Sequence, residues 1–354
     1  MAVLDVPQGS RCVEKVCEMT HCFAAWTKNG ADRAQSTSGG MFSAIARHFL
    51  ADGGMVVAAK YGEGLRIEHG VAERAEDLDY MRGVKYAQGV IGKDVYAAVR
   101  EILPKRRIAF FGLPCQCAAM RKLFGRDGNL LIVDLVCFGA PSMRLWQKYV
   151  EWLERKQGKR LVSVNPRYKG HGWSRKTYYR YEWDDGSASS QLSLFDPYAQ
   201  AFYSALGFRR CCFACPFRGI ERQTDMTIGD CWGVENMGLG LGEEEIGRGV
   251  SGVLVHNERA QKIFDGLDIW SREISVAAYV KENSPLVASP KMPDAWPEFS
   301  KDAASLDFGD LIEKWNLKVS RTRFIINGIK SVARRILGRT SCRTSCESHA
   351  KSAK

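Results

Sequence analysis

Two short apolar runs constrain the fold most strongly, because each of them leads directly to a cysteine. Residues 107–111 and 130–136 predict buried strands, each followed by a helical pattern. Cys115 stands just beyond the first run, at the start of a helix, and Cys137 just beyond the second. The carboxyl ends of strands form the ligand-binding edge of an open α/β sheet, so both thiols should reach one crevice. A helix amino terminus should also lower the pKa of Cys115.

The remaining pattern predicts the same architecture. Residues 41–50 predict a helix with one apolar face, and residues 55–61 predict a buried strand. Alternation of apolar and polar residues within residues 161–183 predicts strands with one solvent-exposed face. Further elements are expected as a helix over 195–206 and strands over 226–228 and 252–256. We therefore predict an α/β (mixed α+β) fold in which helices flank a mixed sheet. The segment 238–249, with five glycines and three consecutive glutamates, is predicted to be a mobile loop.

The composition is typical of a folded, non-secreted protein. The 354 residues are 45% hydrophobic and 26% charged, and no apolar stretch approaches the roughly 18 residues of a membrane-spanning helix. The first fifteen residues lack the pattern of a secretory signal. We therefore expect a cytoplasmic protein, in which the twelve cysteines stay mainly reduced. Grouped cysteines then indicate a metal or catalytic site sooner than disulfides.

The positive charge is concentrated in the tail. Eleven Lys or Arg residues and one acid lie between Lys314 and Lys354, so this segment carries ten of the eleven net positive charges. A general affinity for nucleic acid is therefore not expected. Residues 324–337 predict an amphipathic helix with a basic polar side, which would lie on an anionic inner-membrane surface, on an acidic partner or on its own domain. Residues after Gly338 are predicted to be disordered.

Cys212 and Cys215 form the sharpest local motif. Two thiolates at this spacing can hold one metal ion, since the turn between them directs both sulfurs to the same side. Together with Cys115 and Cys137 they predict a tetrathiolate site. Each cysteine by itself is equally well explained as a small core residue. Zinc and a [4Fe–4S] cluster both suit four thiolates, and the spacing does not separate them.

Five ordered motifs within residues 22–265 add a family resemblance. They are Ser36-Thr37-Ser38-Gly39-Gly40, Lys85-Tyr86-Ala87-Gln88, Gly112-Leu113-Pro114-Cys115-Gln116, Asp134-Leu135-Val136-Cys137-Phe138-Gly139, and Cys212-x-x-Cys215 followed by Asp225-Met226-Thr227-Ile228-Gly229-Asp230-Cys231-Trp232-Gly233. In this order they resemble the beta subunit of coenzyme F420 hydrogenase/dehydrogenase. That family includes chlorophyll-related reductases and bacterial members linked to polysaccharide gene clusters.

The resemblance implies FAD and a [4Fe–4S] cluster, with electron transfer between them and hydride exchange at the flavin. It favours iron–sulfur over zinc, with Cys115, Cys137, Cys212 and Cys215 as the metal ligands. The residues it implies for cofactor binding are Ser36, Thr37, Ser38, Gly39, Gly40, Lys85, Tyr86, Gln88, Gly112, Pro114, Gln116, Asp230 and Trp232. It leaves the catalytic residues unassigned.

The residues themselves leave alternatives open. The segment Ser36–Gly40 precedes a helix, so it can cradle a pyrophosphate or simply form an N-cap with a glycine turn. Lys85 either places a positive charge near the flavin N1/C2 edge or is a solvated lysine above Tyr86. Asp230 and Trp232 either line the pocket for the flavin ring or lie at the end of a strand and pack against the core.

Several features depart from the family pattern. Many relatives carry a ferredoxin-like segment that is not expected here, because Cys12, Cys17 and Cys22 do not fit its spacing. A separate carrier would then deliver the electrons. Phe138 replaces the usual histidine and Cys231 the usual aromatic residue. Cys231 and Cys211 are therefore candidate alternative ligands.

Three functions follow. The leading hypothesis is an oxidoreductase that uses FAD and [4Fe–4S] to pass electrons between a reduced carrier (coenzyme F420, ferredoxin or nicotinamide) and a small-molecule acceptor. The second is a non-catalytic electron-transfer or accessory subunit of a complex, with polysaccharide biosynthesis as a candidate context. The third is a zinc-binding module.

The sequence also predicts how the chain is divided. The predicted parts are an irregular segment over residues 1–22, a flavin-phosphate region over 23–105, an Fe–S and flavin region over 106–312, and a basic tail over 313–354 that contains the amphipathic helix.

Overall fold

The computed structural model describes residues 20–318. Its strands are β1 (His21–Thr27), β2 (Met55–Tyr61), β3 (Ile67–Ala72), β4 (Ile108–Gly112), β5 (Leu130–Leu135), β6 (Leu161–Asn165), β7 (Tyr178–Trp183), β8 (Ala188–Leu192), β9 (Met226–Asp230), β10 (Ser251–Val255) and β11 (Ile269–Glu273). Its α-helices are α1 (Gly30–Gln35), α2 (Met41–Ala51), α3 (Leu78–Met81), α4 (Lys93–Ile102), α5 (Pro114–Phe124), α6 (Met143–Gln157), α7 (Pro197–Tyr203), α8 (Glu243–Gly247), α9 (Glu258–Asp265), α10 (Val276–Glu282), α11 (Trp296–Ser305) and α12 (Phe308–Lys314). Short 3₁₀ helices are η1 (Glu63–Leu65), η2 (Ala75–Asp77), η3 (Ser193–Phe195), η4 (Arg210–Ala214), η5 (Val234–Asn236) and η6 (Ser284–Leu286).

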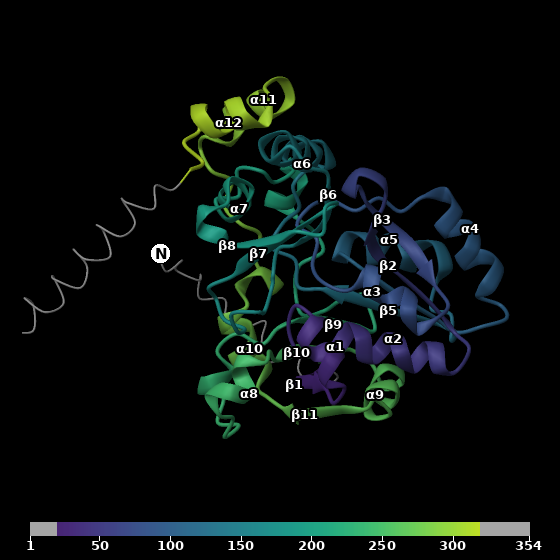
Figure 1. Ribbon diagram of the computed structural model, residues 1–354. Helices are drawn as coiled ribbons and strands as arrows, with labels where there is room; N and C mark the ends of the chain where they lie inside the picture. Colours follow the sequence, from purple (N-terminus) through teal and green to yellow (C-terminus); the bar gives the residue numbers. More distant parts are fainter. Residues whose placement is uncertain (1–19, 319–354) are drawn as a thin grey trace, which may run out of the picture.

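The strands form two sheets. The larger has eight strands in the order β11-β1-β10-β9-β5-β4-β2-β3, and the smaller has three in the order β6-β7-β8. Within the large sheet β2, β4, β5 and β9 pair in parallel, whereas the strands at both ends pair antiparallel. Helices cover this sheet (Figure 1), so the predicted mixed α/β fold is confirmed. Strands from residues 23–105 and 106–312 share the large sheet.

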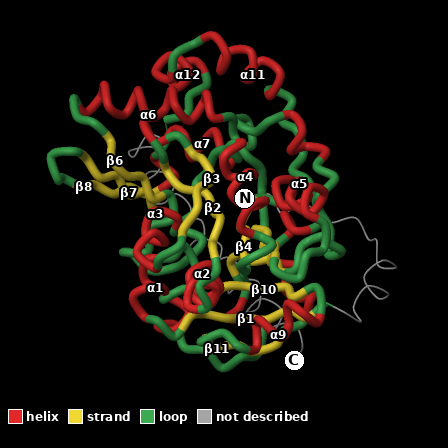
Figure 2. Tube along the Cα trace, turned by 90° about the vertical axis from the view of Figure 1, so that its right-hand side faces the viewer, coloured by secondary structure: helices red, strands yellow, loops and turns green. Residues whose placement is uncertain are grey.

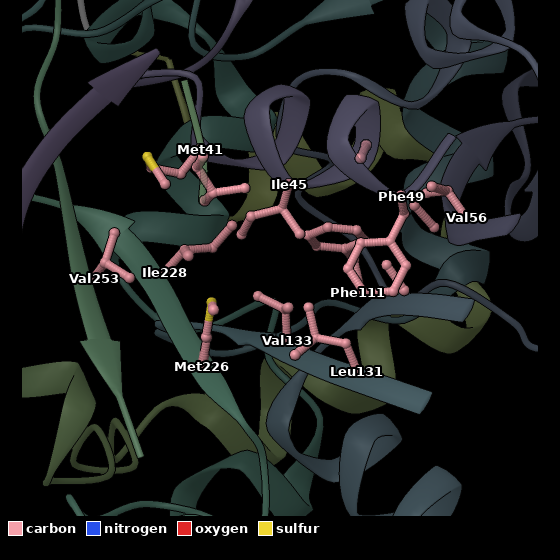
Figure 3. Packing of buried hydrophobic residues seen from close by; sticks show 14 of the residues in the cluster. Met41, Ile45, Phe49, Val56, Phe111, Leu131, Val133, Met226, Ile228 and Val253 are labelled. Carbon is pink, nitrogen blue, oxygen red and sulfur yellow. The ribbon is translucent and has the colours of Figure 1, made fainter. Parts of the chain in front are cut away.

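Helix α2 supplies one face of the main core. Met41, Ile45 and Phe49 lie one turn apart along the helix and are almost completely buried. They pack towards Val133 of β5 and Ile228 of β9 (Figure 3). Burying a side chain of this size contributes about 1.5–3 kcal/mol. The apolar face predicted for residues 41–50 is therefore what fixes α2 on the sheet.

A second core lies beneath the small sheet. Figure 2 shows β6, β7 and β8 at the side of the molecule, next to α6. Aromatic side chains fill the space, including the fully buried Trp146, Tyr149 and Tyr198. The buried carboxylate of Asp196 accepts hydrogen bonds from the hydroxyls of Tyr149 (2.7 Å) and Tyr181 (2.8 Å). These bonds offset the cost of burying the carboxylate in an apolar core.

Most predicted elements are confirmed within one or two residues, and the exceptions have local causes. The helix expected over 195–206 is shorter, because α7 begins at Pro197 after its N-cap Asp196 and ends before Ala205, whose φ is +62°. His21 and Cys22 were expected in an irregular segment but begin β1, which pairs with β10 and β11. Strand β8 was not predicted. The predicted helix over 324–337, Cys12 and Cys17 lie outside the described residues.

A helix needs roughly 20 mainly apolar residues to cross a lipid bilayer. Among residues 20–318, no helix is both long and apolar enough for such a span.

We predict that Gly252→Ala destabilises the protein. A methyl group at this position of β10 would lie 2.1 Å from Cε2 of Tyr279, a fully buried ring. Overpacking of a core typically costs about 1–3 kcal/mol. The urea midpoint of Gly252→Ala should therefore fall clearly, whereas Gly128→Ala, whose methyl group meets no atom within 4 Å, should leave it unchanged. Equal midpoints for the two variants would contradict this packing.

Candidate metal and cofactor site

Two of the predicted ligands stand at the same edge of the sheet. β4 and β5 run parallel, with Gly112 opposite Asp134, so the segments that follow them leave the sheet side by side. Cys115 is the second residue of α5, and Cys137 lies two residues beyond β5. The side chain of Gln116 fixes the first of these segments, accepting from the amide of Leu113 and donating to the carbonyl of Gly89, both at 2.9 Å.

The other two predicted ligands come from η4. Cys212 lies within this short helix and Cys215 caps its end. The Cys212 thiol approaches the carbonyl oxygen of Ala140 at 4.0 Å, and the amide of Cys215 donates to Ser289 Oγ at 3.1 Å. Ala140 lies three residues after Cys137, so η4 packs directly against the segment that follows β5.

The four thiols share one electrostatic neighbourhood. Burial raises the pKa of Cys137 to about 12; Arg218 opposes this rise, and Cys212, Cys115 and Cys215 add to it. Because Coulomb interactions weaken with distance, these mutual effects indicate that the four thiols lie in one part of the molecule. Among residues 20–318, however, no three His, Cys, Asp or Glu side chains are grouped closely enough to hold a metal ion. The structure thus gathers the predicted ligands without assembling a finished ligand shell.

The expected lowering of the pKa of Cys115 is wrong. Although Cys115 keeps part of its surface exposed, the surrounding protein raises its pKa by desolvation, and the negative charge of Cys215 raises it further. Hydrogen bonds at the start of α5 act in the opposite direction but are outweighed. A metal would therefore have to displace thiol protons as it binds.

The candidate alternative ligands differ in position. Cys231 is completely buried in an apolar cluster with Cys22 and Tyr279, and the charges that act on it are those of Asp230 and Glu235. This places Cys231 in the core on the side of β1 and α10. Cys211, by contrast, is exposed and directly adjacent to Cys212.

The Ser36–Gly40 segment is held mainly by its own chain. Ser36 Oγ donates to the carbonyl of Asp32 (2.6 Å), and Ser38 Oγ donates to that of Val250 (2.7 Å). Thr37 Oγ1 accepts from the amide of Val84 (3.0 Å), and the amide of Gly39 donates to Ser251 Oγ (2.9 Å). These contacts show that the side chains of this segment hold the local fold together, as in the alternative of an N-cap with a glycine turn. Gly40, at φ +84°, is the N-cap of α2 and offers no side-chain hydrogen bond to the first amides of this helix. These amides are therefore the groups in this segment that could bind an anion.

A methyl group on Gly39 would lie 2.4 Å from the carbonyl oxygen of Ala25. Only glycine therefore allows this segment to approach β1 so closely.

Lys85 is enclosed rather than solvated. Its ammonium group donates to the carbonyls of Met81, Arg82 and Gly83 at 3.0–3.1 Å, and burial lowers its pKa to about 7. These carbonyls end α3, so Lys85 caps that helix. All three of its donors are used.

The rest of the Lys85–Gln88 motif faces the aromatic core. The ring of Tyr86 stacks on Phe202 with 4.3 Å between centroids, and its carbonyl accepts from the hydroxyl of Tyr198 at 2.7 Å. The amide of Gln88 donates to the carbonyl of Pro141 at 3.0 Å. This last bond ties the motif to the segment after Cys137.

Asp230 and Trp232 belong to a charged and aromatic cluster that includes two residues the sequence did not single out. Arg167 makes a two-pronged ion pair with Asp230 (2.8 and 3.2 Å) and lies 5.1 Å from the centre of the Trp232 ring. Trp173 donates to Asp230 (3.0 Å) and stacks on Trp232 (4.6 Å). Burial by itself would lower the pKa of Arg167. The interactions of Arg167 with Asp230 and Tyr86 outweigh this effect, so its pKa is raised. The cluster therefore connects two predicted motifs.

Lys169 is a further residue that the sequence did not reveal. Its ammonium group donates to the carbonyls of Ser38 (2.6 Å) and Arg248 (3.0 Å) and to that of Arg33. It thereby joins the Ser36–Gly40 segment to the end of the glycine-rich segment 238–249. That segment contains α8, and Arg33 anchors it as well by donating to the carbonyl of Gly249 at 3.0 Å. Only the tertiary contacts reveal this role, because a single lysine after a strand carries no motif.

A buried polar network supports the segment before Cys137. Asp134 forms an ion pair with Arg222 and accepts from the hydroxyl of Thr227 at 2.5 Å. The same hydroxyl pairs with Nε2 of His256 at 2.8 Å. Burial, with a smaller contribution from the Arg222 cation, lowers the pKa of His256 to about 3. His256 is therefore neutral in the folded protein at physiological pH.

Comparison with known proteins identifies the family of the central region. Residues 105–276 match the sequence model for the carboxyl-terminal part of the beta subunit of coenzyme F420 hydrogenase/dehydrogenase. This match supports the family relationship that the motifs predicted. The relationship indicates a redox or electron-transfer role.

One solved structure is similar over most of the chain. It is a chain of the F420-reducing [NiFe] hydrogenase complex from Methanosarcina barkeri, studied with xenon. The similarity covers 84% of this chain and 92% of that chain, with 16% sequence identity and a TM-score of 0.47. Comparison with curated proteins gives no match.

We predict that His256 makes stability depend on pH. The unfolded chain takes up a proton near pH 6.5, whereas folded His256 resists protonation down to about pH 3. Stability should therefore fall as the pH decreases through this window, by up to about 1.4 kcal/mol per pH unit from this group. His256→Gln should flatten the dependence of the urea midpoint between pH 7 and pH 5. The same change at the exposed His171 should not, and equal slopes for both variants would contradict the assignment.

Proposed function

We propose that the protein is an oxidoreductase that uses FAD and a [4Fe–4S] cluster to pass electrons between a reduced carrier and a small-molecule acceptor. The observation that carries this proposal is the gathering of Cys115, Cys137, Cys212 and Cys215 in one region from three separate segments. That region lies within the part of the chain that matches the family.

The donor set fits an iron–sulfur cluster. The titratable groups that shift the pKa of Cys137 are Arg218 and three other thiols. The ligands available to a metal at this position are therefore thiolate sulfurs. Thiolates hold [4Fe–4S] clusters and also tetrahedral zinc, and the family relationship favours the cluster. Cys115, Cys137, Cys212 and Cys215 would hold it, and their thiols would lose their protons on binding.

The residues also suit a flavin. The uncapped start of α2 offers amides to a pyrophosphate, and Lys169 holds the preceding segment at Ser38. Arg167, Asp230 and Trp232 supply charge and an aromatic face beside Tyr86. Bound FAD would supply hydride and single-electron chemistry.

Aromatic rings connect the Lys85–Gln88 motif to the segment after Cys137. Tyr86 stacks on Phe202 at 4.3 Å, and Phe202 meets Phe138 at 6.0 Å. Phe138 directly follows Cys137 in the sequence. Phe138, which replaces the usual histidine, thus adds an aromatic ring to this contact.

The candidate carriers are coenzyme F420, ferredoxin and nicotinamide. A second candidate function, an electron-transfer subunit of a complex, is favoured by the open groove beside η4. This groove has a volume of about 830 Å³ and is lined by apolar side chains and two cations. Its lining residues are Arg210, Cys211, Phe213, Ala214, Ser289, Pro290, Lys291 and Met292. A partner seated there would lie next to Cys212. Turnover of an acceptor by the isolated chain would exclude an obligate subunit.

We predict that anaerobic reconstitution yields a brown protein with about four iron atoms per chain, as a [4Fe–4S] cluster requires. Serine in place of Cys115, Cys137, Cys212 or Cys215 should lower iron retention at least about tenfold, since losing even an outer-sphere partner costs that much. Cys211→Ser is the matched control, because it removes a neighbouring thiol and should keep the cluster. Iron content, absorbance and EPR report the result.

A protein that takes up zinc but neither iron nor FAD would overturn the proposed function in favour of the zinc-binding module. Iron retained in Cys137→Ser but lost in Cys211→Ser would instead reassign the ligands.

We also predict that Lys169→Met weakens FAD binding. Without the ammonium group the Ser36–Gly40 segment loses its link through Lys169 to the carbonyl of Arg248, so the start of α2 is less well placed for the pyrophosphate. The loss of these hydrogen bonds should raise the Kd for FAD about tenfold, equivalent to about 1.4 kcal/mol. Lys176→Met changes an exposed lysine of the same loop region and should bind FAD normally. The Kd for FAD is measured by flavin fluorescence titration. Equal Kd values for the Lys169→Met and Lys176→Met variants would show that Lys169 does not contribute to FAD binding.

A further inference from the structure

Arg218 stands where the predicted ligand segments meet. It follows Cys215 by three residues, and one terminal nitrogen donates to the carbonyl of Phe138, the residue after Cys137, at 2.9 Å. The other terminal nitrogen donates to the carbonyl of Pro285 in η6. One side chain therefore joins the segment after β5, the segment after η4 and the loop that leads to α11.

The charge of Arg218 has no carboxylate partner among the described residues. Its hydrogen-bond acceptors are backbone carbonyls, and its Nε–H is buried without an acceptor in residues 20–318. Arg222, only four residues further along the chain, differs because it forms an ion pair with Asp134. The electrostatic neighbours that favour charged Arg218 are Cys137, Cys215 and Cys212.

Such an arrangement is costly in a protein without a bound anion. An enclosed guanidinium with an unused donor loses hydration that two carbonyl bonds replace only in part. Four thiolates around a [4Fe–4S] core carry a net negative charge in every common oxidation state. The net charge and hydrogen bonds around such a cluster set its reduction potential. The unused Nε–H and the unpaired charge therefore match an anionic cluster at these thiols.

We propose that Arg218 is a positioning residue that clamps the Cys137 segment to η4 and raises the reduction potential of the cluster through its positive charge. This inference rests on the proposed function. Reduction adds one negative charge to the cluster, and a fixed neighbouring cation stabilises that charge. The side chain stays protonated throughout, so no proton transfer accompanies its effect.

The test compares three variants of the reconstituted holoprotein by EPR-monitored redox titration. Arg218→Gln removes the charge, Arg218→Lys keeps it, and Arg210→Gln removes an exposed cation of the same segment. We expect Arg218→Gln to disfavour the reduced cluster about tenfold, a shift of about 59 mV to lower potential for one electron. Arg218→Lys should restore most of this shift, and Arg210→Gln should stay close to the wild type because water screens its charge.

A second measurement uses the chain before reconstitution. Hydrogen–deuterium exchange in the peptide covering residues 136–141 should be faster in Arg218→Gln than in Arg210→Gln, because the clamp on the carbonyl of Phe138 is lost. Equal exchange rates would overturn the positioning role, including the case in which Arg218→Gln fails to hold iron.

An assembled cluster with an unchanged potential in Arg218→Gln would overturn the electrostatic role. These outcomes differ from failure of the proposed function, in which the wild-type chain itself takes up no iron.

Discussion

The parallel pairing of β4 with β5 is the interaction on which the candidate site depends. It fixes Gly112 beside Asp134, so the two segments that follow must leave the sheet at the same edge and on the same side. Cys115 and Cys137 then lie in the same region although they are 22 positions apart in the sequence. The η4 helix completes the group only because it packs on Ala140, in the segment that this pairing has already placed.

Partly buried cationic side chains that donate to backbone carbonyls recur in the candidate site. Lys85 caps α3, Lys169 joins the Ser36–Gly40 segment to residue 248, and Arg218 joins the segments that carry the thiols. A long cationic side chain suits this task, because several donors on one flexible stem can reach carbonyls of different segments. Irregular segments are thereby held in place without regular secondary structure. Among them, Arg218 places a positive charge where the anionic cluster is proposed to bind.

How far the sequence could predict these features depended on how local their cause was. The apolar face of residues 41–50 follows from helical periodicity, and the structure uses Ile45 and Phe49 as expected. The predicted lowering of the pKa of Cys115 failed, because the sequence shows the helix start but not the protein that buries it. Lys169 and Arg167 could not be predicted, since their partners lie more than 60 residues away in the chain. Lys85 was predicted as important, but its three carbonyl partners were not.

Residue types, short spacings and the order of motifs were enough to predict the fold class and the family relationship and to select the four thiols as candidate ligands. Which cysteines share a region became known only from the tertiary contacts. Those contacts place Cys231 in the core beside Cys22, and they bring Cys212 and Cys215 to the edge that carries Cys115 and Cys137. The reason is physical: electrostatic coupling and burial depend on distances between segments remote in sequence, and only the packed sheet sets those distances.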